Sequence, residues 1–188
     1  LVWSDYWKDV VDRYSSQYRG RAVVGGPLRP TGSDAPEAEG RSVLIPYEAM
    51  APLAELAAYV RKLSVAGVPV VFKARRDVPL AAQLRAYGLK SDARVVYDLT
   101  ADVLREVASA AGTYSTVLFD LIGRGKPAAL LRTSFDYGHL LVEDGLADEF
   151  CPDDAPQRLL NLQSRPDARA RLRGVERRLR DTLADELA

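Results

Sequence analysis

Short apolar runs alternate with helical stretches along most of this chain. Runs such as Ser42–Pro46 and Ala128–Leu131 contain no charged residue, whereas the segments between them place apolar side chains three or four residues apart. A strand that is apolar on both sides must be covered on both sides, and such strands are typical of parallel sheets. The pattern therefore predicts an α/β fold, a Rossmann-like doubly wound parallel sheet, followed by a C-terminal helical extension.

The same periodicity predicts the individual elements. We expect strands at residues 21–25, 42–46, 68–73, 94–97 and 128–131. We expect helices at residues 5–18, 52–65, 79–87, 101–110, 155–162 and 166–187, with a further short helix that begins near Ser115. Thr100 is a suitable N-cap for the helix that follows it. Residues 27–40 are expected to form an exposed loop, and residues 136–146 a turn-rich connector.

The chain divides into three predicted segments. It begins Leu-Val-Trp-Ser rather than with Met, and it lacks both the basic start of a signal peptide and a long apolar run. We therefore interpret residues 1–20 as a helix that leads in from an N-terminal half outside this chain. Residues 21–150 are expected to form a Rossmann-like nucleotide-binding domain, and residues 151–188 are expected to be helices that pack on the same domain.

Composition excludes several classes of protein. Lys plus Arg total 26 and so do Asp plus Glu, so no net field attracts nucleic acid, and no nucleic-acid partner is expected. The single cysteine, Cys151, and the single histidine, His139, exclude a disulfide framework and a zinc site built from Cys and His. We interpret both residues as structural. A lone cysteine is typical of a reducing compartment, so a cytoplasmic location is predicted.

Residues 111–131 carry the clearest functional signal. A hydroxyl-rich loop precedes a short amphipathic helix, which is followed by a Gly-Arg-Gly-Lys-Pro turn and a buried strand. A helix N-terminus offers backbone N–H groups and a partial positive charge, so small or hydroxylated residues before it favour a phosphate pocket. These residues are Gly112, Thr113, Ser115 and Thr116. The alternative is an ordinary β-loop-α-loop-β unit with a Ser or Thr cap.

Three cations directly follow the expected strand at residues 68–73. They are Lys73, Arg75 and Arg76. Because arginine suits bidentate contact with phosphate, we predict that these side chains bind phosphate together with the hydroxyl-rich loop. The alternative is a solvated strand end in which Asp77 is the local partner of the cations.

Three further positions are candidates for contact with a ribose or a base. Gly26 follows the expected strand at 21–25, where glycine lets the backbone approach a ligand closely. Glu48 follows the next strand, and Asp120 lies on the short helix, where its carboxylate could accept hydrogen bonds from ribose hydroxyls. Alternatively, Gly26 forms a plain turn, Glu48 begins a helix, and Asp120 faces solvent or pairs with Arg124 four residues later.

The last expected helix is amphipathic. Arg169, Arg173, Arg177 and Arg180 share one face, and leucine and valine side chains occupy the other. A basic amphipathic helix can lie on an anionic membrane, so peripheral association with the inner face of the plasma membrane is one interpretation. The alternative is that the apolar face packs on the domain and leaves a solvated basic face.

The order of these motifs resembles the donor-nucleotide half of GT-B glycosyltransferases. Bacterial surface and capsular polysaccharide transferases and the CDP-glycerol glycerophosphotransferases are the most similar groups. Residues 114–120, Tyr-Ser-Thr-Val-Leu-Phe-Asp, resemble their Tyr-Ser-Ser-x-x-Phe-Asp segment, and residues 125–127 resemble their Gly-Lys-Pro turn. Residues 25–29 are similar to their Gly-Asn-Pro-Arg turn, and residues 43–48 to the strand after it.

The resemblance implies a metal-independent transferase without a cofactor that binds a nucleotide-activated sugar or polyol phosphate. It implies phosphate contacts at Ser115 and Thr116 and a ribose near Asp120, with the acceptor and the general base on a separate N-terminal domain. The catalytic residues are therefore unknown. At residues 73–76 the family pattern Lys-x-His-Pro is replaced by Lys-Ala-Arg-Arg, which supplies no histidine to the donor. The alternative is a degenerate, non-catalytic GT-B-like domain that serves as an interaction or scaffolding module.

Overall fold

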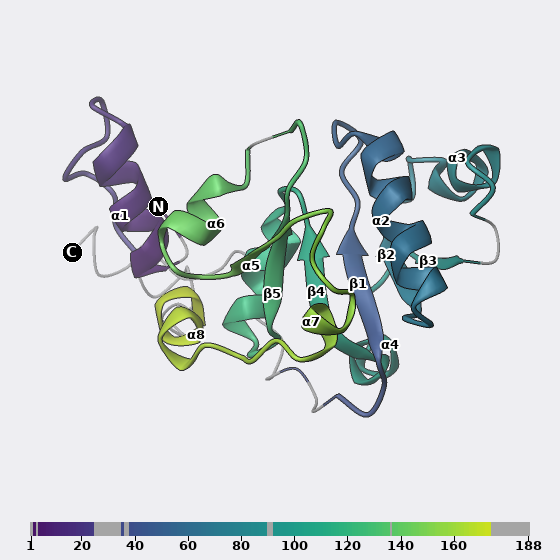
Figure 1. The fold of residues 1–188 in the computed structure, drawn as a ribbon. Coiled ribbons are helices and arrows are strands. Elements are labelled where there is room, and N and C mark those ends of the chain that lie inside the picture. The colour runs from purple at the N-terminus through teal and green to yellow at the C-terminus, as the bar shows by residue number, and fades with distance from the viewer. Residues whose placement is uncertain are drawn as a thin grey trace.

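A six-stranded parallel sheet forms the centre of the computed structural model, which describes residues 2, 4–24, 35, 38–89, 92–135 and 137–173. The strands lie in the order β3-β2-β1-β4-β5-β6, so β1 and β4 are neighbours at the centre (Figure 1). The strands are β1 (Ser42–Pro46), β2 (Val70–Lys73), β3 (Ala93–Val96), β4 (Val107–Gly112), β5 (Ala128–Leu131) and β6 (Asp148–Phe150). This is a doubly wound, Rossmann-like order, and it confirms the predicted fold class.

Helices cover both faces of this sheet. One face carries α2 (Leu53–Val65), α3 (Leu80–Ala86) and α7 (Gln157–Leu160). The other face carries α1 (Asp5–Tyr14), α4 (Ala101–Glu106), α5 (Thr116–Gly123), α6 (His139–Glu143) and α8 (Pro166–Arg173). Thr100 is the N-cap of α4, as predicted, because its Oγ1 accepts a hydrogen bond from the N–H of Val103 at 3.3 Å.

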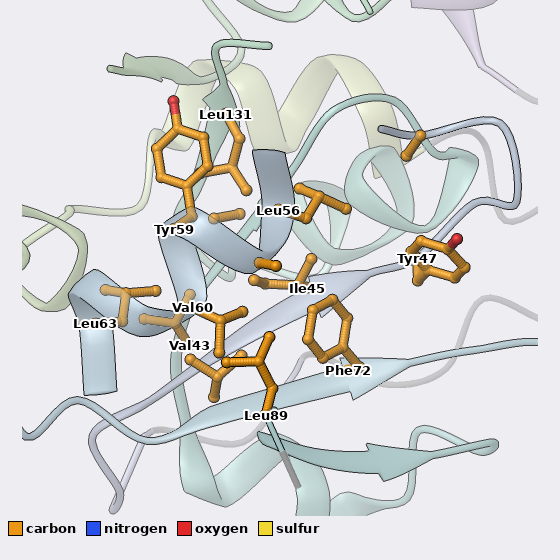
Figure 2. Close-up of a cluster of buried hydrophobic side chains, with 14 of the residues drawn as sticks. Val43, Ile45, Tyr47, Leu56, Tyr59, Val60, Leu63, Phe72, Leu89 and Leu131 are labelled. Atoms are coloured by element: carbon orange, nitrogen blue, oxygen red, sulfur yellow. The ribbon is translucent and has the colours of Figure 1, made fainter. Parts of the chain in front are cut away.

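Alternate residues of each strand enter two separate cores. In β1, Val43 and Ile45 pack with Phe72 of β2 on the α2 side (Figure 2), whereas Leu44 enters the core on the α5 side. Because successive side chains point to opposite faces, a strand buried on both faces needs an apolar residue at nearly every position. The uninterrupted apolar runs therefore located β1 and β5 at the expected residues.

The predicted helix at residues 101–110 is wrong in its second half. Helix α4 ends at Glu106, and the chain continues without a break into β4, which begins at Val107. The sequence of β4 is Val-Ala-Ser-Ala-Ala-Gly, and the intrinsic propensity of alanine favours a helix. Here β4 lies between β1 and β5 with both faces packed, so tertiary packing overrides local propensity and selects small side chains.

The predicted strand at residues 21–25 is also wrong where the structure describes it. The N–H of Arg21 donates to the carbonyl oxygen of Tyr18 at 2.9 Å, so this residue lies in a turn. Val24 forms only an isolated bridge with Val2, apart from the sheet. Gly25 lies outside the described residues. Among the described residues, the backbones of these two valines pair only with Val2, whose N–H donates to the carbonyl oxygen of Val23 at 2.9 Å. A contact this short does not make a strand of a sheet.

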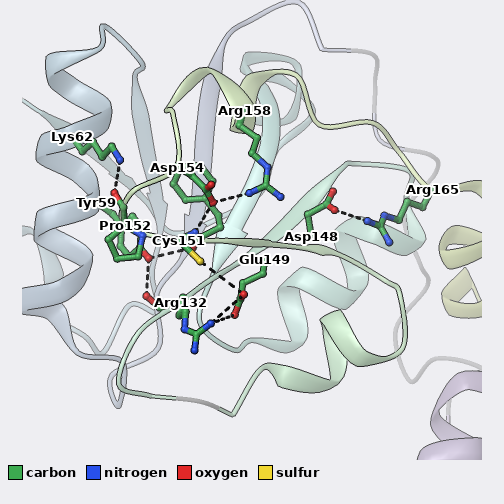
Figure 3. A network of polar contacts seen from close by, with 11 residues as sticks. Tyr59, Lys62, Arg132, Asp148, Glu149, Cys151, Pro152, Asp154, Arg158 and Arg165 are labelled. Atoms are coloured by element: carbon green, nitrogen blue, oxygen red, sulfur yellow. Dashed lines mark hydrogen bonds and ion pairs between the residues drawn. The ribbon is translucent and has the colours of Figure 1, made fainter.

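The segment expected as a connector at residues 136–146 contains α6, and the edge strand β6 follows it. The apolar pattern did not predict β6 because two of its three side chains are charged. Asp148 forms an ion pair with Arg165 at 2.6 Å, and Glu149 forms one with Arg132 at 3.4 Å (Figure 3). Only Phe150 of β6 is fully buried, because an edge strand exposes one side to solvent.

Helices near the two ends of the described chain pack on α5. The ring of Phe119 lies 4.9 Å from that of Trp7 in α1, and Gly123 lies against Leu172 of α8. The expected last helix is described only to Arg173, so Arg177 and Arg180 lie outside the described residues. None of the helices in the described part of the chain is both long and apolar enough to cross a membrane.

Candidate functional site

The candidate site lies where the order of strands reverses. From β1 the chain builds the sheet outward through β2 and β3, and from β4 it builds in the opposite direction. In open parallel sheets this reversal leaves a crevice at the carboxyl ends of the two central strands, where ligands bind. The loop after β1 contains Glu48 and the loop after β4 contains Thr113 and Ser115, so both loops meet at this crevice.

Ser115 joins the two loops. It is the N-cap of α5, with extended backbone, and its Oγ accepts a hydrogen bond from the N–H of Val117 at 3.2 Å. The same hydroxyl donates to Oε1 of Glu48 at 2.8 Å, and the residue is buried. The Ser cap considered from the sequence is therefore present, and a carboxylate from the neighbouring strand end holds the capping hydroxyl.

A cavity of about 300 Å³ opens beside this helix N-terminus. Its polar side comes from Glu48, Ser115 and Thr116, and its apolar side comes from α1, α5 and the segment before and within α6. The lining residues are Trp7, Glu48, Tyr114, Ser115, Thr116, Phe119, Tyr137, Gly138 and Leu140. Small-molecule sites usually have apolar walls with a few placed polar groups, and this cavity has that composition at the small end of the usual size range.

Aromatic rings form two walls of the cavity. Trp7 and Phe119 lie with ring centroids 4.9 Å apart on one side. On the other, the ring of Tyr114 lies 6.3 Å from that of Tyr137, and Phe135 packs between them at 5.0 and 4.6 Å. None of these rings was predicted from the sequence as a site residue. Tyr114 and Phe119 lie in the same motif as Ser115, so the sequence could have indicated that they line the site. Trp7 reaches the site only through the tertiary packing of α1.

Gly138 and Thr113 bring the α6 segment against the end of β4. Thr113 is buried and is not one of the residues that line the cavity. A Cβ on Gly138 would lie 2.0 Å from the carbonyl oxygen of Thr113 and 2.3 Å from Cδ1 of Leu130. Only glycine permits this approach, which places Tyr137 and Leu140 on the cavity wall.

The predicted cations lie one strand farther along the same edge and do not line the cavity. Lys73 ends β2 and donates to the carbonyl oxygen of Ala74 at 3.2 Å. Arg75 forms an ion pair with Asp77 at 2.8 Å, and both side chains are exposed.

Arg76 pairs with Asp98, and its guanidinium lies 5.8 Å from the ring centroid of Tyr97. The local partner considered for the cations, Asp77, is therefore engaged with Arg75 in this structure. A bidentate phosphate contact by Arg75 or Arg76 would have to displace these carboxylates.

Asp120 lies on α5, one turn beyond Thr116, and does not line the cavity. Its carboxylate lies 3.9 Å from Nη1 of Arg124, the i,i+4 pair considered from the sequence. Burial raises the pKa of Asp120, and the nearby positive charge of Arg124 opposes that shift. The side chain of Asp120 is 45% exposed, so a ligand can reach it, and a ligand hydroxyl that donates to the carboxylate would stabilise its charged form.

Four further positions were considered from the sequence: Gly26, Glu48, His139 and Cys151. Gly26 lies outside the described residues, so its contact with a ribose or base stays a prediction. Glu48 does not begin a helix: its carbonyl oxygen accepts from the N–H of Ala51 in a turn, and α2 begins at Leu53. His139 is exposed at the start of α6, and Cys151 follows β6, where its N–H donates to Asp154 at 2.7 Å.

Solved glycosyltransferases share this fold. SnogD from Streptomyces nogalater matches 88% of this chain and 48% of its own, with a TM-score of 0.52 and 14% identity. The calicheamicin glycosyltransferase CalG4 matches 86% of this chain and 43% of its own, with a TM-score of 0.51 and 18% identity. UGT89C1 from Arabidopsis thaliana, solved with UDP-L-rhamnose, matches 98% of this chain and 53% of its own, with a TM-score of 0.54 and 16% identity.

These neighbours are GT-B glycosyltransferases, and this chain spans about half the length of each. At such identities the likeness shows the fold: a Rossmann-like α/β domain of the kind found in GT-B enzymes. No protein-family model matches the chain, and no curated protein matches its sequence.

Proposed function

We propose that this chain is the donor-binding domain of a GT-B glycosyltransferase or glycerophosphotransferase. The single observation that carries the proposal is the cavity at the N-terminus of α5, at the point where the strand order reverses. A Rossmann-like domain places its ligand at this point, and the helix N-terminus there favours negative charge. The neighbour solved with UDP-L-rhamnose supports a nucleotide-activated sugar as the ligand class.

The proposed chemistry is transfer of a sugar or polyol phosphate from a nucleotide donor to a glycan acceptor. The bond between the transferred group and the nucleotide phosphate breaks, and negative charge grows on the leaving phosphate. The N-terminus of α5 and the hydroxyls of Ser115 and Thr116 would stabilise that charge. The cations that follow β2 would do the same; they are Lys73, Arg75 and Arg76. We propose that the reaction needs no metal and that a separate acceptor domain supplies the general base.

The biological setting is part of the same proposal. The motif order that resembles CDP-glycerol and capsular polysaccharide transferases favours bacterial surface polysaccharide synthesis. We propose that this synthesis takes place in the cytoplasm, with peripheral contact to the inner face of the plasma membrane. A fragment that holds the donor site alone should bind donor nucleotide and show no turnover.

Calorimetric titration tests the proposal. The chain is titrated with CMP, CDP, UDP and GDP, and the variants Ser115→Ala and Arg75→Ala are titrated with whichever nucleotide binds. Saturable binding that Ser115→Ala weakens about tenfold, the size of a lost hydrogen bond to a charged group, would support a donor site. Arg105→Ala is the matched control for Arg75→Ala, because its ion pair with Asp102 is also exposed but lies on α4. Absence of measurable binding of any of the four nucleotides would contradict donor binding by this chain.

A specific contact favours a second candidate, the non-catalytic module. The hydroxyl of Ser115 donates to Glu48, and Arg75 and Arg76 form ion pairs with carboxylates. Side chains of the protein therefore already bind most of the groups that were expected to bind phosphate. In that case the domain would hold a partner subunit or the rest of its own chain. Co-purification of a partner by a chain that binds none of the four nucleotides would favour this candidate.

A further inference from the structure

Strand β3 forms one edge of the sheet, beside β2 (Figure 1). In the part of the chain that the structure describes, no strand pairs with its outer side. We propose that β3 pairs there with β3 of a second copy of this chain, antiparallel across a two-fold axis, so that the two sheets join into one. The inference goes beyond the proposed donor site, which lies between β1 and β4, two strands away from this edge.

The backbone of β3 limits where the axis can lie. The N–H of Ala74 donates to the carbonyl oxygen of Val96 at 2.9 Å, so the backbone groups of Val96 face β2. Because successive residues of a strand direct these groups to opposite sides, those of Val95 face outward. Outward residues of one copy must lie opposite outward residues of the other. A two-fold axis that passes through a residue meets this condition, whereas an axis between two residues does not.

The start of β3 excludes an axis at its first residue. The chain turns at Asp92, whose N–H donates to the carbonyl oxygen of Leu89 at 3.3 Å. The carboxylate of Asp92 accepts a hydrogen bond from the hydroxyl of Ser64 at 2.7 Å, which also holds it to its own chain. Pairing therefore begins at Ala93, and the axis lies farther along the strand.

Charge selects among the positions that remain. An axis at Arg94 would place two arginines opposite each other. An axis at Val95 would bring Asp98 of one copy toward Asp92 of the other. An axis at Val96 instead places Arg94 of each copy opposite Asp98 of the other, because these residues lie two positions on either side of Val96. Opposite charges that face each other across antiparallel strands stabilise the pair, and like charges destabilise it. The axis at Val96 lengthens β3 by two residues, since the strand of the single chain ends there.

Two exposed ion pairs extend this contact. Arg94 pairs with Glu106, and Asp98 pairs with Arg76. In the dimer these pairs join into one row of alternating charge, from Glu106 and Arg94 of one copy to Asp98 and Arg76 of the other. An isolated exposed pair contributes little, whereas a network of charges contributes more. Charges on an edge strand usually keep copies apart, but here antiparallel pairing brings opposite charges together.

Sedimentation velocity of the chain tests the proposal. A small interface of this kind is weak, so the chain is examined from about 10 to about 500 µM, where we expect a reversible equilibrium of monomer and dimer. Arg94→Glu and Asp98→Lys each bring like charges together across the axis and should weaken self-association at least about tenfold. Arg158→Glu is the matched control and should change nothing, because Arg158 is an exposed, ion-paired arginine next to α7, away from β3.

A mixture of the two variants separates paired edges from an effect on folding. When the Arg94→Glu chain meets the Asp98→Lys chain, opposite charges face each other at both contacts. The mixture should therefore associate about as strongly as the wild-type chain, although neither variant does so alone. A wild-type chain that stays monomeric at about 500 µM, or a mixture that associates no more than its components, would overturn the inference. Thermal unfolding followed by circular dichroism shows that each variant is folded.

A cysteine at the axis tests the position of the pairing. The two copies of residue 96 would form a pair without mutual hydrogen bonds, with Cα atoms about 4.5 Å apart, which a disulfide can bridge. With Cys151→Ser present, Val96→Cys should give a crosslinked dimer under mild oxidation. Tyr97→Cys should give little, because residue 97 lies opposite Val95 of the other copy. Equal crosslinking of the two variants would contradict an axis at Val96.

Discussion

The carboxylate of Glu48 and the hydroxyl of Ser115 lie 2.8 Å apart, although 67 residues separate them in the sequence. They meet because β1 and β4 are neighbours at the centre of the sheet and both strands end at the same edge. One hydroxyl therefore caps α5 and fixes Glu48, the one acid among the described residues that line the cavity. Helix stability and the electrostatics of the candidate site depend on the same atom.

Removal of that hydroxyl should destabilise the domain more than removal of an ordinary cap. Ser115→Ala loses the bond from the N–H of Val117 and leaves Glu48 without its partner in a half-buried position. We expect a loss of about 2 kcal/mol in the free energy of unfolding, at the upper end for N-cap substitutions. Thr100→Ala, at the N-cap of α4, is the matched control and should cost about 1 kcal/mol. Urea denaturation of both variants measures the difference, and equal losses would show that the Glu48 contact contributes nothing.

The close approach of Gly138 to β4 leads to a second prediction. In Gly138→Ala the new methyl group would meet the carbonyl oxygen of Thr113 at 2.0 Å, so the α6 segment must move away from the cavity. We expect a loss of about 2 kcal/mol, typical of overpacking in a tight site, together with weaker ligand binding.

Gly112→Ala is the control for Gly138→Ala, because it lies at the same sheet edge. There the nearest atom is Cδ1 of Leu118 at 3.2 Å, the end of a flexible side chain that can shift. Its loss of unfolding free energy in the same denaturation experiment should be the smaller of the two. The reverse order would show that the α6 segment yields more easily than the core beneath α5.

The fold could be read from the sequence because most of its strands are apolar on both faces. The strands that the sequence did not predict, β4 and β6, share one physical cause: whether a segment forms a strand depends on the strands beside it. Ala110 and Ala111 in β4 belong to an alanine-rich stretch whose local preference is helical, yet they lie in the most enclosed part of the sheet. Asp148 and Glu149 make β6 look like a loop, yet this edge strand tolerates them because their partners are on the surface.

The candidate site was predictable only in part, for a similar reason. The hydroxyl-rich loop before α5 marks a helix N-terminus through local chemistry, so Ser115 could be singled out as a cap. Glu48 could be placed at the end of its strand, but its contact with Ser115 depends on the strand order. Trp7 comes from a helix near the start of the chain, and nothing in the local sequence indicates that its ring meets Phe119.

An ion pair between α1 and the end of α6 should stabilise the wall that carries Trp7. Arg13 donates from Nη1 and Nη2 to the two oxygens of Asp144, each at 2.7 Å, and the carboxylate is nearly buried. We expect Asp144→Asn to lower the free energy of unfolding by about 1 kcal/mol, because a bidentate pair of this kind is stronger than an exposed one. Asp102→Asn is the control, since its ion pair with Arg105 is highly exposed and should contribute little.

The contribution of Asp144 should depend on pH in a defined direction. The hydrogen bond from Arg13 holds the pKa of this carboxyl below its usual value. An unfolded aspartate titrates near pH 4, so the stabilisation is complete above about pH 5 and is lost as the pH falls through the lowered folded pKa. The difference in unfolding free energy between wild type and Asp144→Asn should therefore shrink steadily below about pH 4. A difference that stays constant down to pH 2 would contradict the ion-pair mechanism.

We expect Asp120 to lower the free energy of unfolding at pH 7 and to contribute to nucleotide binding. Because burial raises its pKa in the folded state, the folded chain holds the proton more tightly than the unfolded chain. The tighter binding of this proton by the folded chain therefore stabilises the fold fully below about pH 4. This stabilisation is lost as the pH rises through the raised pKa of the folded state. Asp120→Asn should then equal or exceed the wild type in stability at pH 7 while showing no such gain at pH 3. Chemical denaturation at the two pH values measures this, with Asp9→Asn in α1, an exposed aspartate outside α5, as the control.

If the carboxylate of Asp120 accepts hydrogen bonds from ribose hydroxyls, the same substitution should weaken binding. We expect Asp120→Asn to raise the dissociation constant of the nucleotide about tenfold at pH 7, as for one hydrogen bond to a charged acceptor, while inorganic pyrophosphate binds unchanged. Opposite changes in stability and affinity are typical of a residue kept for function, because binding sites retain groups that do not stabilise the fold. Lower stability at pH 7 with unchanged nucleotide affinity would instead assign Asp120 to the surface pair with Arg124, which lies 3.9 Å away.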